Sequence, residues 1–159
     1  MSHLRPDGSM HMVNVGAKPD THRLAIAEAR VLLSATTRRS LRHNPKGDVL
    51  AAARLAGIQA AKRTWELIPL CHPVALTHVA LDLLLKPWGV LVRAQAETVG
   101  QTGVEMEAMT AASVAALTLY DMLKASERGI RIETVQLIEK RGGRSGVWKR
   151  RKMQHGVAS

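Results

Sequence analysis

Residues 102–125 read TGVEMEAMTAASVAALTLYDMLKA, and this stretch decides the fold. Small and apolar residues recur through it every three or four positions, which predicts a helix whose backbone can approach its neighbours closely. The stretch also holds three carboxylates and one ammonium, from Glu105, Glu107, Asp121 and Lys124. Because charged residues are unusual in a helix suited to burial, these four residues are candidates for a functional role.

The remaining elements follow from changes in the hydrophobic pattern. Apolar and polar residues alternate over residues 21–34, which favours a half-buried strand, although the alanines there also permit a helix. Residues 48–65 are rich in alanine, with Asp48 in the position of an N-cap, and predict a helix. Alternation then returns on both sides of the turn sequence KPWG, which predicts a hairpin. We expect its strands at 77–85 and 90–97, and a last strand at 130–140.

The resulting order of strand, helix, strand, strand, helix, strand matches the ferredoxin-like arrangement. We expect an α+β fold in which an antiparallel four-stranded sheet carries two long helices on one face. The many small residues of the helices would let them lie tightly against the sheet. If the other face of the sheet is also apolar, it would need a partner chain.

The length of the chain limits its organisation to one core. A chain of 159 residues can bury one substantial core, but it is short for two. We expect a flexible N-terminal segment at residues 1–11, a single domain at 12–146 that holds any catalytic site, and a basic C-terminal tail at 147–159.

The composition argues against several classes of protein. No run of about 18 apolar residues is present, so we expect no membrane span. The N-terminus lacks the apolar core of a signal peptide, which makes the cytoplasm the expected location. Cys71 is the only cysteine, so no disulfide can form within the chain. His72 and His78 match no metal-binding spacing, and we predict no metal site.

The net charge of +10 comes mainly from the C-terminal end, because residues 140–152 hold seven Lys and Arg and no acid. One interpretation is that residues 147–159 are a frayed, solvated tail. The other is attraction to polyanions, either a nucleic acid or a phosphorylated small molecule. The chain has no Phe and one Tyr, so it lacks the aromatic side chains on which single-stranded bases stack. Small phosphates are therefore favoured, and a basic nucleic-acid-binding module is the alternative.

Asp121 is the most informative charge of the opening stretch. It shares a helix face with Val114, Leu117 and Lys124, at spacings of three and four residues. If that face is buried, the carboxylate needs a cation, which Lys124 can supply, and the pair would titrate as a unit. The alternative is an ordinary exposed salt bridge near the end of the helix. The residues alone leave both interpretations open.

Two other places could transfer a proton. Glu105 and Glu107 lie where loop becomes helix, close to the positive end of the helix dipole. His72 is held between Pro69 and Pro73 on a stiff connector. A proton-transferring or phosphate-contacting imidazole requires such a mount, although a structural histidine is the more common outcome.

Two further segments could bind an anion. Lys46 and Gly47 precede the helix at 48–65, where free backbone N–H groups attract negative charge. Residues 140–146, KRGGRSG, gather three cations around flexible glycines. Together with the acids, these segments describe a pocket for a phosphorylated substrate that undergoes proton transfers.

Three stretches also carry a resemblance to a known family. They are KGDVLAAARLAGIQAAKRTWELIPLCHP at residues 46–73, the opening stretch at 102–125, and KRGGRSG at 140–146. In these stretches the chain resembles the cyclic pyranopterin monophosphate synthase family, also called molybdenum cofactor biosynthesis protein C. The resemblance covers residues 12–146.

The resemblance implies a cytoplasmic enzyme that forms a homohexamer, a trimer of dimers, with its active sites at subunit interfaces. Such an enzyme converts 3',8-cyclo-7,8-dihydroguanosine 5'-triphosphate to cyclic pyranopterin monophosphate and releases pyrophosphate. A radical SAM GTP cyclase supplies that substrate. The resemblance implies that the enzyme requires no cofactor. A magnesium ion bound to the substrate phosphates is left open.

The resemblance also assigns residues to the site. It implies that Asp121 is the active-site acid or base and that Lys124 is its companion. The implied substrate-binding residues are Leu70, Cys71, His72, Met106 and Glu107, with Glu105, Lys46, Arg23, Lys18 and Lys140 expected near the ligand.

Four positions depart from the family pattern. Asn14 stands where Asp is expected, Gln101 where Lys is frequent, and Arg144 where Lys is usual. In addition, only His43 precedes the sequence NPKGD, where two histidines are common. Arg144 keeps the charge but offers a planar fork, so the contact with a phosphate there would differ.

Overall fold

The structure is a computed structural model that describes residues 3–41 and 44–151. In the described residues one antiparallel sheet has the strand order β2-β3-β1-β4-β5. The elements are β1 (Thr21–Leu32), α1 (Ala35–Ser40), α2 (Val49–Lys62), α3 (Thr64–Leu67), β2 (His78–Lys86), β3 (Gly89–Gly100), α4 (Glu105–Leu123), β4 (Arg131–Arg141) and β5 (Trp148–Lys149). Apart from α1, α3 and β5, this order confirms the predicted ferredoxin-like α+β fold.

The sheet has five strands instead of the predicted four. The extra strand, β5, lies beside the end of β4, where Glu139 is opposite Lys149 and Lys140 is opposite Trp148. The interpretation of residues 147–159 as a frayed tail is therefore wrong for the start of that segment, whereas residues 152–159 lie outside the described residues. A strand of two residues carries no alternating pattern, which explains why periodicity missed it.

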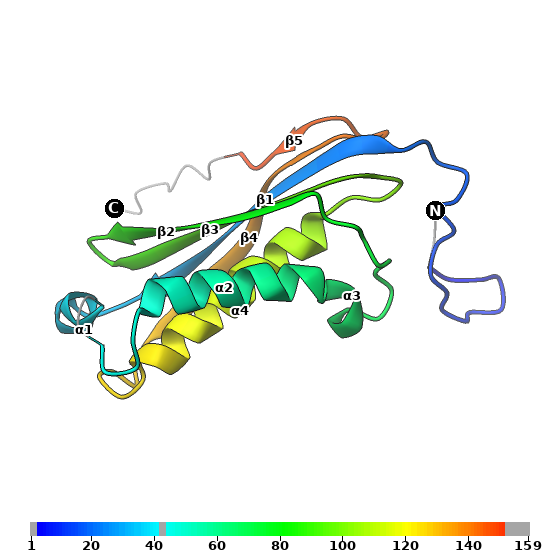
Figure 1. The fold of residues 1–159 in the computed structure, drawn as a ribbon. Helices are drawn as coiled ribbons and strands as arrows, with labels where there is room; N and C mark the ends of the chain where they lie inside the picture. Colours follow the sequence, from blue (N-terminus) through cyan, green and yellow to red (C-terminus); the bar gives the residue numbers. More distant parts are fainter. Residues whose placement is uncertain (1–2, 42–43, 152–159) are drawn as a thin grey trace, which may run out of the picture.

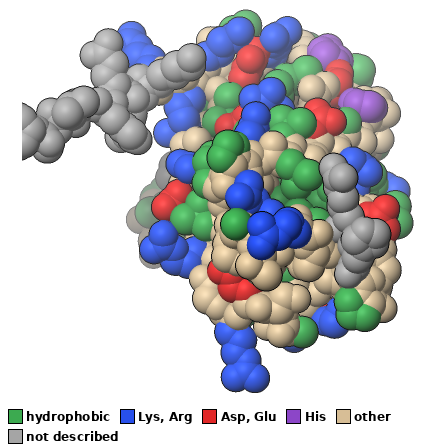
Figure 2. Space-filling view, turned by 90° about the vertical axis from the view of Figure 1, so that its left-hand side faces the viewer, with side chains coloured by type: hydrophobic (Ala, Val, Ile, Leu, Met, Phe, Trp, Pro, Cys, Tyr) green, Lys and Arg blue, Asp and Glu red, His purple; other side chains and the backbone are tan. Residues whose placement is uncertain are grey.

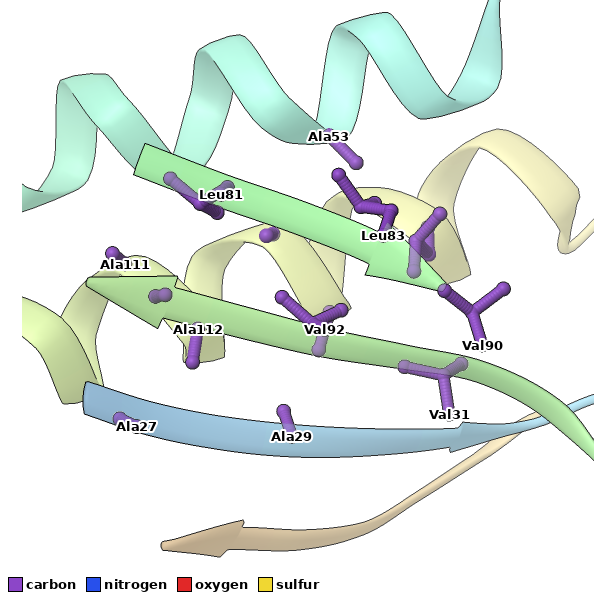
Figure 3. Close-up of a cluster of buried hydrophobic side chains, with 14 of the residues drawn as sticks. Ala27, Ala29, Val31, Ala53, Leu81, Leu83, Val90, Val92, Ala111 and Ala112 are labelled. Carbon is purple, nitrogen blue, oxygen red and sulfur yellow. The ribbon is translucent and has the colours of Figure 1, made fainter. Parts of the chain in front are cut away.

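The two long helices, α2 and α4, cover one face of the sheet (Figure 1). The central strand β1 pairs with β3 along its whole length, from Thr21 opposite Gly100 to Leu32 opposite Gly89. Alternate residues of β1 face the helices and are fully buried, as the period of two requires. Figure 3 shows these side chains meeting those of β2, β3 and the helices in one apolar layer.

Small side chains set the close approach of α2 and α4. Alanines at four positions of α4 that contribute to the core, Ala108, Ala111, Ala112 and Ala115, have no exposed surface. A Cβ on Gly57 of α2 would overlap the Leu81 side chain and lie 2.9 Å from the carbonyl oxygen of Ala111. The predicted tight packing of the helical layer thus depends on the absence of a side chain at one position.

The predicted helix at 48–65 is two helices. Asp48 caps α2 as expected, since its side chain accepts a hydrogen bond from the backbone N–H of Ala51 at 2.9 Å. Arg63 then leaves the helical conformation, with φ −115° and ψ 13°, and α3 adds one further turn. The break directs the chain toward the proline-flanked connector that holds His72.

The N-terminal residues form a small turn structure. Leu4 and Met10 are joined by an antiparallel bridge, and Gly8, with φ 81°, takes the positive backbone angle that a tight turn favours. The expected flexibility of residues 1–11 stays a prediction. None of the helices within residues 3–41 and 44–151 is long and apolar enough to cross a membrane.

Candidate active site

Two adjoining cavities lie beside the first turn of α4. The first has a volume of about 500 Å³ and opens between the start of β1, the loop before α4 and the loop after β4. Its lining includes five cations, namely Lys18, Arg23, Lys140, Arg141 and Arg144. A cavity with this lining attracts an anionic group.

The second cavity has a volume of about 400 Å³ and lies between the connector at 70–74, the N-terminal segment and the first turn of α4. Lys18, Thr102, Gly103 and Glu105 line both cavities, so the two form one continuous region. Nine of the ten predicted substrate-binding residues line this region: Leu70, Cys71, His72, Met106, Glu107, Glu105, Arg23, Lys18 and Lys140.

Glu107 is the carboxylate that the fold buries. Only 4% of its surface is exposed, and burial raises its pKa from 4.5 to about 7, with the negative charge of Glu105 adding to the rise. Burial, together with the Glu107 charge, also raises the pKa of the Cys71 thiol. A carboxyl group that is partly protonated near neutral pH can both donate and accept a proton.

His72 is oriented by a backbone contact. Its Nε2 donates a hydrogen bond to the carbonyl oxygen of Val13 at 2.8 Å. Because a carbonyl can only accept, Nε2 carries the hydrogen, and Nδ1 of the neutral ring is the acceptor. The predicted rigid mount is present, since Pro69 and Pro73 flank the segment and the Val13 carbonyl fixes the ring.

Glu105 and Lys140 join the two sides of the first cavity. The Lys140 Nζ lies 3.2 Å from a carboxylate oxygen of Glu105, and both side chains are about one-third exposed or less. The Glu105 carboxylate lies over Gly103, where a Cβ would overlap it. Gly103 therefore allows the position of Glu105 that reaches Lys140.

Arg23 binds backbone carbonyls at the rim of the first cavity. Its Nε donates to the carbonyl of Gly100 at 3.2 Å and its Nη2 to that of Gln101 at 3.3 Å. The guanidinium also covers Gly143, where a side chain would overlap it. In the described structure Arg23 thus holds two loops together.

Asp121, Lys124 and Lys46 meet at the opposite end of α4. The Lys124 Nζ lies 2.7 Å from one carboxylate oxygen of Asp121. The Lys46 Nζ donates to the Asp121 carbonyl at 2.9 Å and lies 3.8 Å from its carboxylate. The hydrogen bond from Lys124, and the charges of Lys124 and Lys46, lower the pKa of Asp121, and Asp121 raises the pKa of Lys124.

Of the two interpretations left open for Asp121, the single chain shows the exposed salt bridge. The Asp121 and Lys124 side chains are 60% and 52% exposed, and Leu117 on the same face is 58% exposed. The apolar row that suggested burial faces outward, because the alanines of α4 occupy the core side. Figure 2 views this end of the molecule, where Lys and Arg side chains alternate with acidic and exposed hydrophobic ones.

The two groups of candidate residues are separated within one chain. Asp121 follows Glu107 by 14 residues, which is roughly 20 Å along a helix that rises about 1.5 Å per residue. Lys46, the tenth predicted binding residue, lies with Asp121 and lines neither cavity.

Sequence reasoning did not find all the residues around the cavities. His3 lines the second cavity, and its place near the N-terminus gave no pattern to interpret. Thr102 and Gly103 line both cavities, and the signal for them was the glycine just before Glu105. In the described part of the chain, no group of three His, Cys, Asp or Glu residues could hold a metal ion.

Comparison with known proteins identifies the family. Residues 12–143 match the family model described as "MoaC family". The chain is 55% identical over 154 residues to a cyclic pyranopterin monophosphate synthase of Thermomicrobium roseum, covering 94% of this chain and 93% of that protein. It is 51% identical over 151 residues to the synthase of the same name from Novosphingobium aromaticivorans, covering 94% of this chain and 96% of that protein. On this evidence the chain belongs to the MoaC family.

Proposed function

We propose that this chain is a cyclic pyranopterin monophosphate synthase, a phosphorus-oxygen lyase of molybdenum cofactor biosynthesis. It converts 3',8-cyclo-7,8-dihydroguanosine 5'-triphosphate to cyclic pyranopterin monophosphate and pyrophosphate. The observation that carries the proposal is the continuous cavity region, which combines five cations with a buried carboxyl group of raised pKa.

The first cavity holds the phosphates of the substrate. When a substrate oxygen attacks the α-phosphorus, the bond between that phosphorus and the bridging oxygen breaks and pyrophosphate leaves. Lys18, Lys140 and Arg144 stabilise the negative charge that develops on the departing oxygens. Arg144, which replaces the Lys usual in the family, can bind two phosphate oxygens in a fork. Arg23 fixes the loops that carry this cavity.

The second cavity holds the purine-derived part of the substrate. Ring rearrangement needs a group that both removes and returns protons, and Glu107 suits this role because its pKa is raised to about 7. Leu70, Cys71 and Met106 supply apolar surface around the ring system, and His72 presents an oriented imidazole beside it.

Asp121 and Lys124 complete the site from another copy of the chain. The exposed pair lies roughly 20 Å along α4 from Glu107, so one chain cannot bring both groups to one substrate. In a homohexamer built as a trimer of dimers, the end of α4 that carries Asp121, Lys124 and Lys46 lies against the cavities of a neighbour. Exposed Leu55 and Leu117 on the helical layer supply apolar surface for such contacts.

The cellular setting of the proposal is the cytoplasm, where a radical SAM GTP cyclase makes the substrate. No cofactor is part of the proposal, although magnesium can accompany the substrate phosphates. A nucleic-acid-binding module has less support, because three of the seven cations of the basic C-terminal cluster form ion pairs within the chain. Lys140 contacts Glu105, whereas Arg141 and Lys149 contact Glu139.

Turnover of the cyclised nucleotide tests the proposal. The purified protein should convert 3',8-cyclo-7,8-dihydroguanosine 5'-triphosphate to the cyclic monophosphate with equal amounts of pyrophosphate, both measured by chromatography. Uncyclised GTP is the control and should remain unchanged. Recovery of the cyclised nucleotide intact would refute the proposal.

A further inference from the structure

We propose that Glu139 is a positioning residue that, together with β5, holds the loop at residues 142–146 against the first cavity. This loop is called the phosphate loop below. The inference rests on the proposed function, because it concerns how that cavity binds the substrate phosphates.

At the base of the phosphate loop, neighbouring side chains of β4 lie on opposite faces of the sheet. Lys140 is opposite Ala25, which is fully buried under the helices, and its Nζ reaches Glu105 at the first cavity. Glu139 is opposite Ile26, on the face without helices. Since successive side chains of a strand point to opposite faces, Glu139 lies on the other face from Lys140. It lines neither cavity, but it contacts Arg141, which lines the first one.

Glu139 connects the two strands that flank the phosphate loop. One carboxylate oxygen accepts a hydrogen bond from the Nε of Arg141, just before the loop. The other lies 3.5 Å from the Nζ of Lys149, just after it. The Glu139 side chain is only 12% exposed, whereas those of Arg141 and Lys149 are 53% and 63% exposed. The hydrogen bond from Arg141 lowers the pKa of Glu139, so the carboxylate is charged at neutral pH.

Further contacts fasten β5 to β4 behind the loop. The backbone N–H of Arg150 donates to the carbonyl of Ile138 at 2.8 Å, and its Nε donates to the carbonyl of Leu137 at 2.7 Å. The Arg150 guanidinium lies 5.7 Å from the centre of the Trp148 ring. These contacts fix the far end of the phosphate loop, as Figure 1 shows for β5 beside β4.

The phosphate loop makes few backbone hydrogen bonds of its own, so its position depends on contacts from outside it, such as that of Arg23 over Gly143 and those of β5. Gly142, Gly143 and Gly146 have φ of 94°, 71° and 59°, a region that glycine enters freely. Within the described residues the only backbone hydrogen bond between members of the loop runs from Gly146 to Gly143, at 3.1 Å. Arg144 lines the first cavity from this loop, so the fastening by Glu139 and β5 determines where its guanidinium lies.

Kinetics and binding of the variants Glu139→Gln and Lys149→Met test the inference. Neither residue lines a cavity, so neither touches substrate. The KM for the cyclised nucleotide and the Kd for inorganic pyrophosphate, measured by calorimetry, should each rise roughly threefold to tenfold, the size expected when one charged contact is lost. The kcat should change by less than about twofold, since the reacting groups are untouched. The double variant should add little to Glu139→Gln, because that change already removes the charge contact with Lys149.

Glu133→Gln is the matched control. Glu133 lies on the same strand and forms an ion pair with Arg30 at 3.4 Å, but it lines neither cavity. Its substitution should leave KM and Kd unchanged. If Glu139→Gln fails to fold, KM and Kd of the Lys149→Met variant still test the inference, because Lys149 is exposed.

Three results would overturn the inference. The first is that KM and Kd are unchanged in both variants while the wild type is active. This result would contradict the inference but not the proposed function. The second is a fall in kcat at constant KM, which would indicate a general structural role. The third is a wild type that neither binds pyrophosphate nor converts the nucleotide, which would remove the proposed function and this inference together.

Discussion

At the scale of single residues, two carboxylates of one helix have opposite environments. Glu107 lies on the core side at the start of α4 and is 4% exposed, whereas Asp121 lies near its end with a side chain that is 60% exposed. Burial raises the pKa of Glu107, and Lys124 lowers that of Asp121. Groups whose pKa values are pushed apart in this way are suited to different steps of a proton-transfer sequence.

The substitution Glu107→Gln should change how stability depends on pH. The folded protein keeps the Glu107 proton up to about pH 7, but the unfolded chain releases it near 4.5. The free energy of unfolding of the wild type therefore falls between these two values, by on the order of 3 kcal/mol for a shift of this size. Glutamine does not titrate, so the variant should lack this part of the loss. Urea unfolding of both proteins at pH 4 and pH 8, at one protein concentration, measures the difference.

Glu105→Gln is a suitable comparison, because that side chain is more exposed and lies at the same helix start. In the Glu105→Gln variant, the free energy of unfolding should still fall with pH as it does in the wild type. If the free energy of unfolding depended on pH in the same way in the wild type and in Glu107→Gln, the raised pKa of a buried Glu107 would be contradicted.

The substitution Asp121→Ala should abolish product formation without affecting folding. Among the described residues, its side chain forms ion pairs with the exposed Lys124 and the half-exposed Lys46, and such surface pairs contribute little to stability. The midpoint of thermal unfolding should match that of the wild type, and turnover of the cyclised nucleotide should be lost. Near-normal turnover would remove Asp121 from the mechanism.

At the scale of elements, the helical layer depends on close contact between α2 and α4. The periodic patterns predicted β1, the β2–β3 hairpin and both long helices, because each element is long enough to repeat its period several times. They could not predict β5, which has two residues, or the break at Arg63, which depends on backbone angles. They also left the environment of Asp121 open, since counting apolar residues at helical spacing did not reveal that alanines would take the core side.

The substitution Gly57→Ala should destabilise the protein although alanine favours helices. The new Cβ would overlap Leu81 and approach the Ala111 carbonyl oxygen to 2.9 Å. Overpacking of this kind costs about 1–3 kcal/mol, more than the roughly 1 kcal/mol that alanine gains over glycine in a helix. Chemical denaturation would measure the loss.

Gly129→Ala provides the control for that experiment. A Cβ at Gly129 would meet nothing within 4 Å, and stability should stay the same or rise slightly. Equal stability of Gly57→Ala and the wild type would show that the helices can move apart without cost.

At the scale of the whole molecule, the candidate residues form two groups at opposite ends of α4. Nine of the ten binding residues that the family resemblance implied line one region, because the segments around His72 and Glu107 meet where the connector approaches the start of the helix. Sequence reasoning could not separate Lys46 and Asp121 from that region, since the distance along α4 becomes visible only in three dimensions. The account therefore requires that association of chains joins the two groups into one active site.

Recovery of activity in mixed assemblies tests this requirement most directly. Asp121→Ala and Glu107→Gln, each expected to be inactive, would be dissociated, mixed in equal amounts and reassembled. A mixed pair of chains then holds one site with both groups intact, so about one quarter of wild-type activity should return for random pairing across a two-fold interface. Mixing Asp121→Ala with Lys124→Ala should restore nothing, because both residues come from the same end of the chain. No recovery in assemblies proven to contain both variants would contradict a site shared between chains.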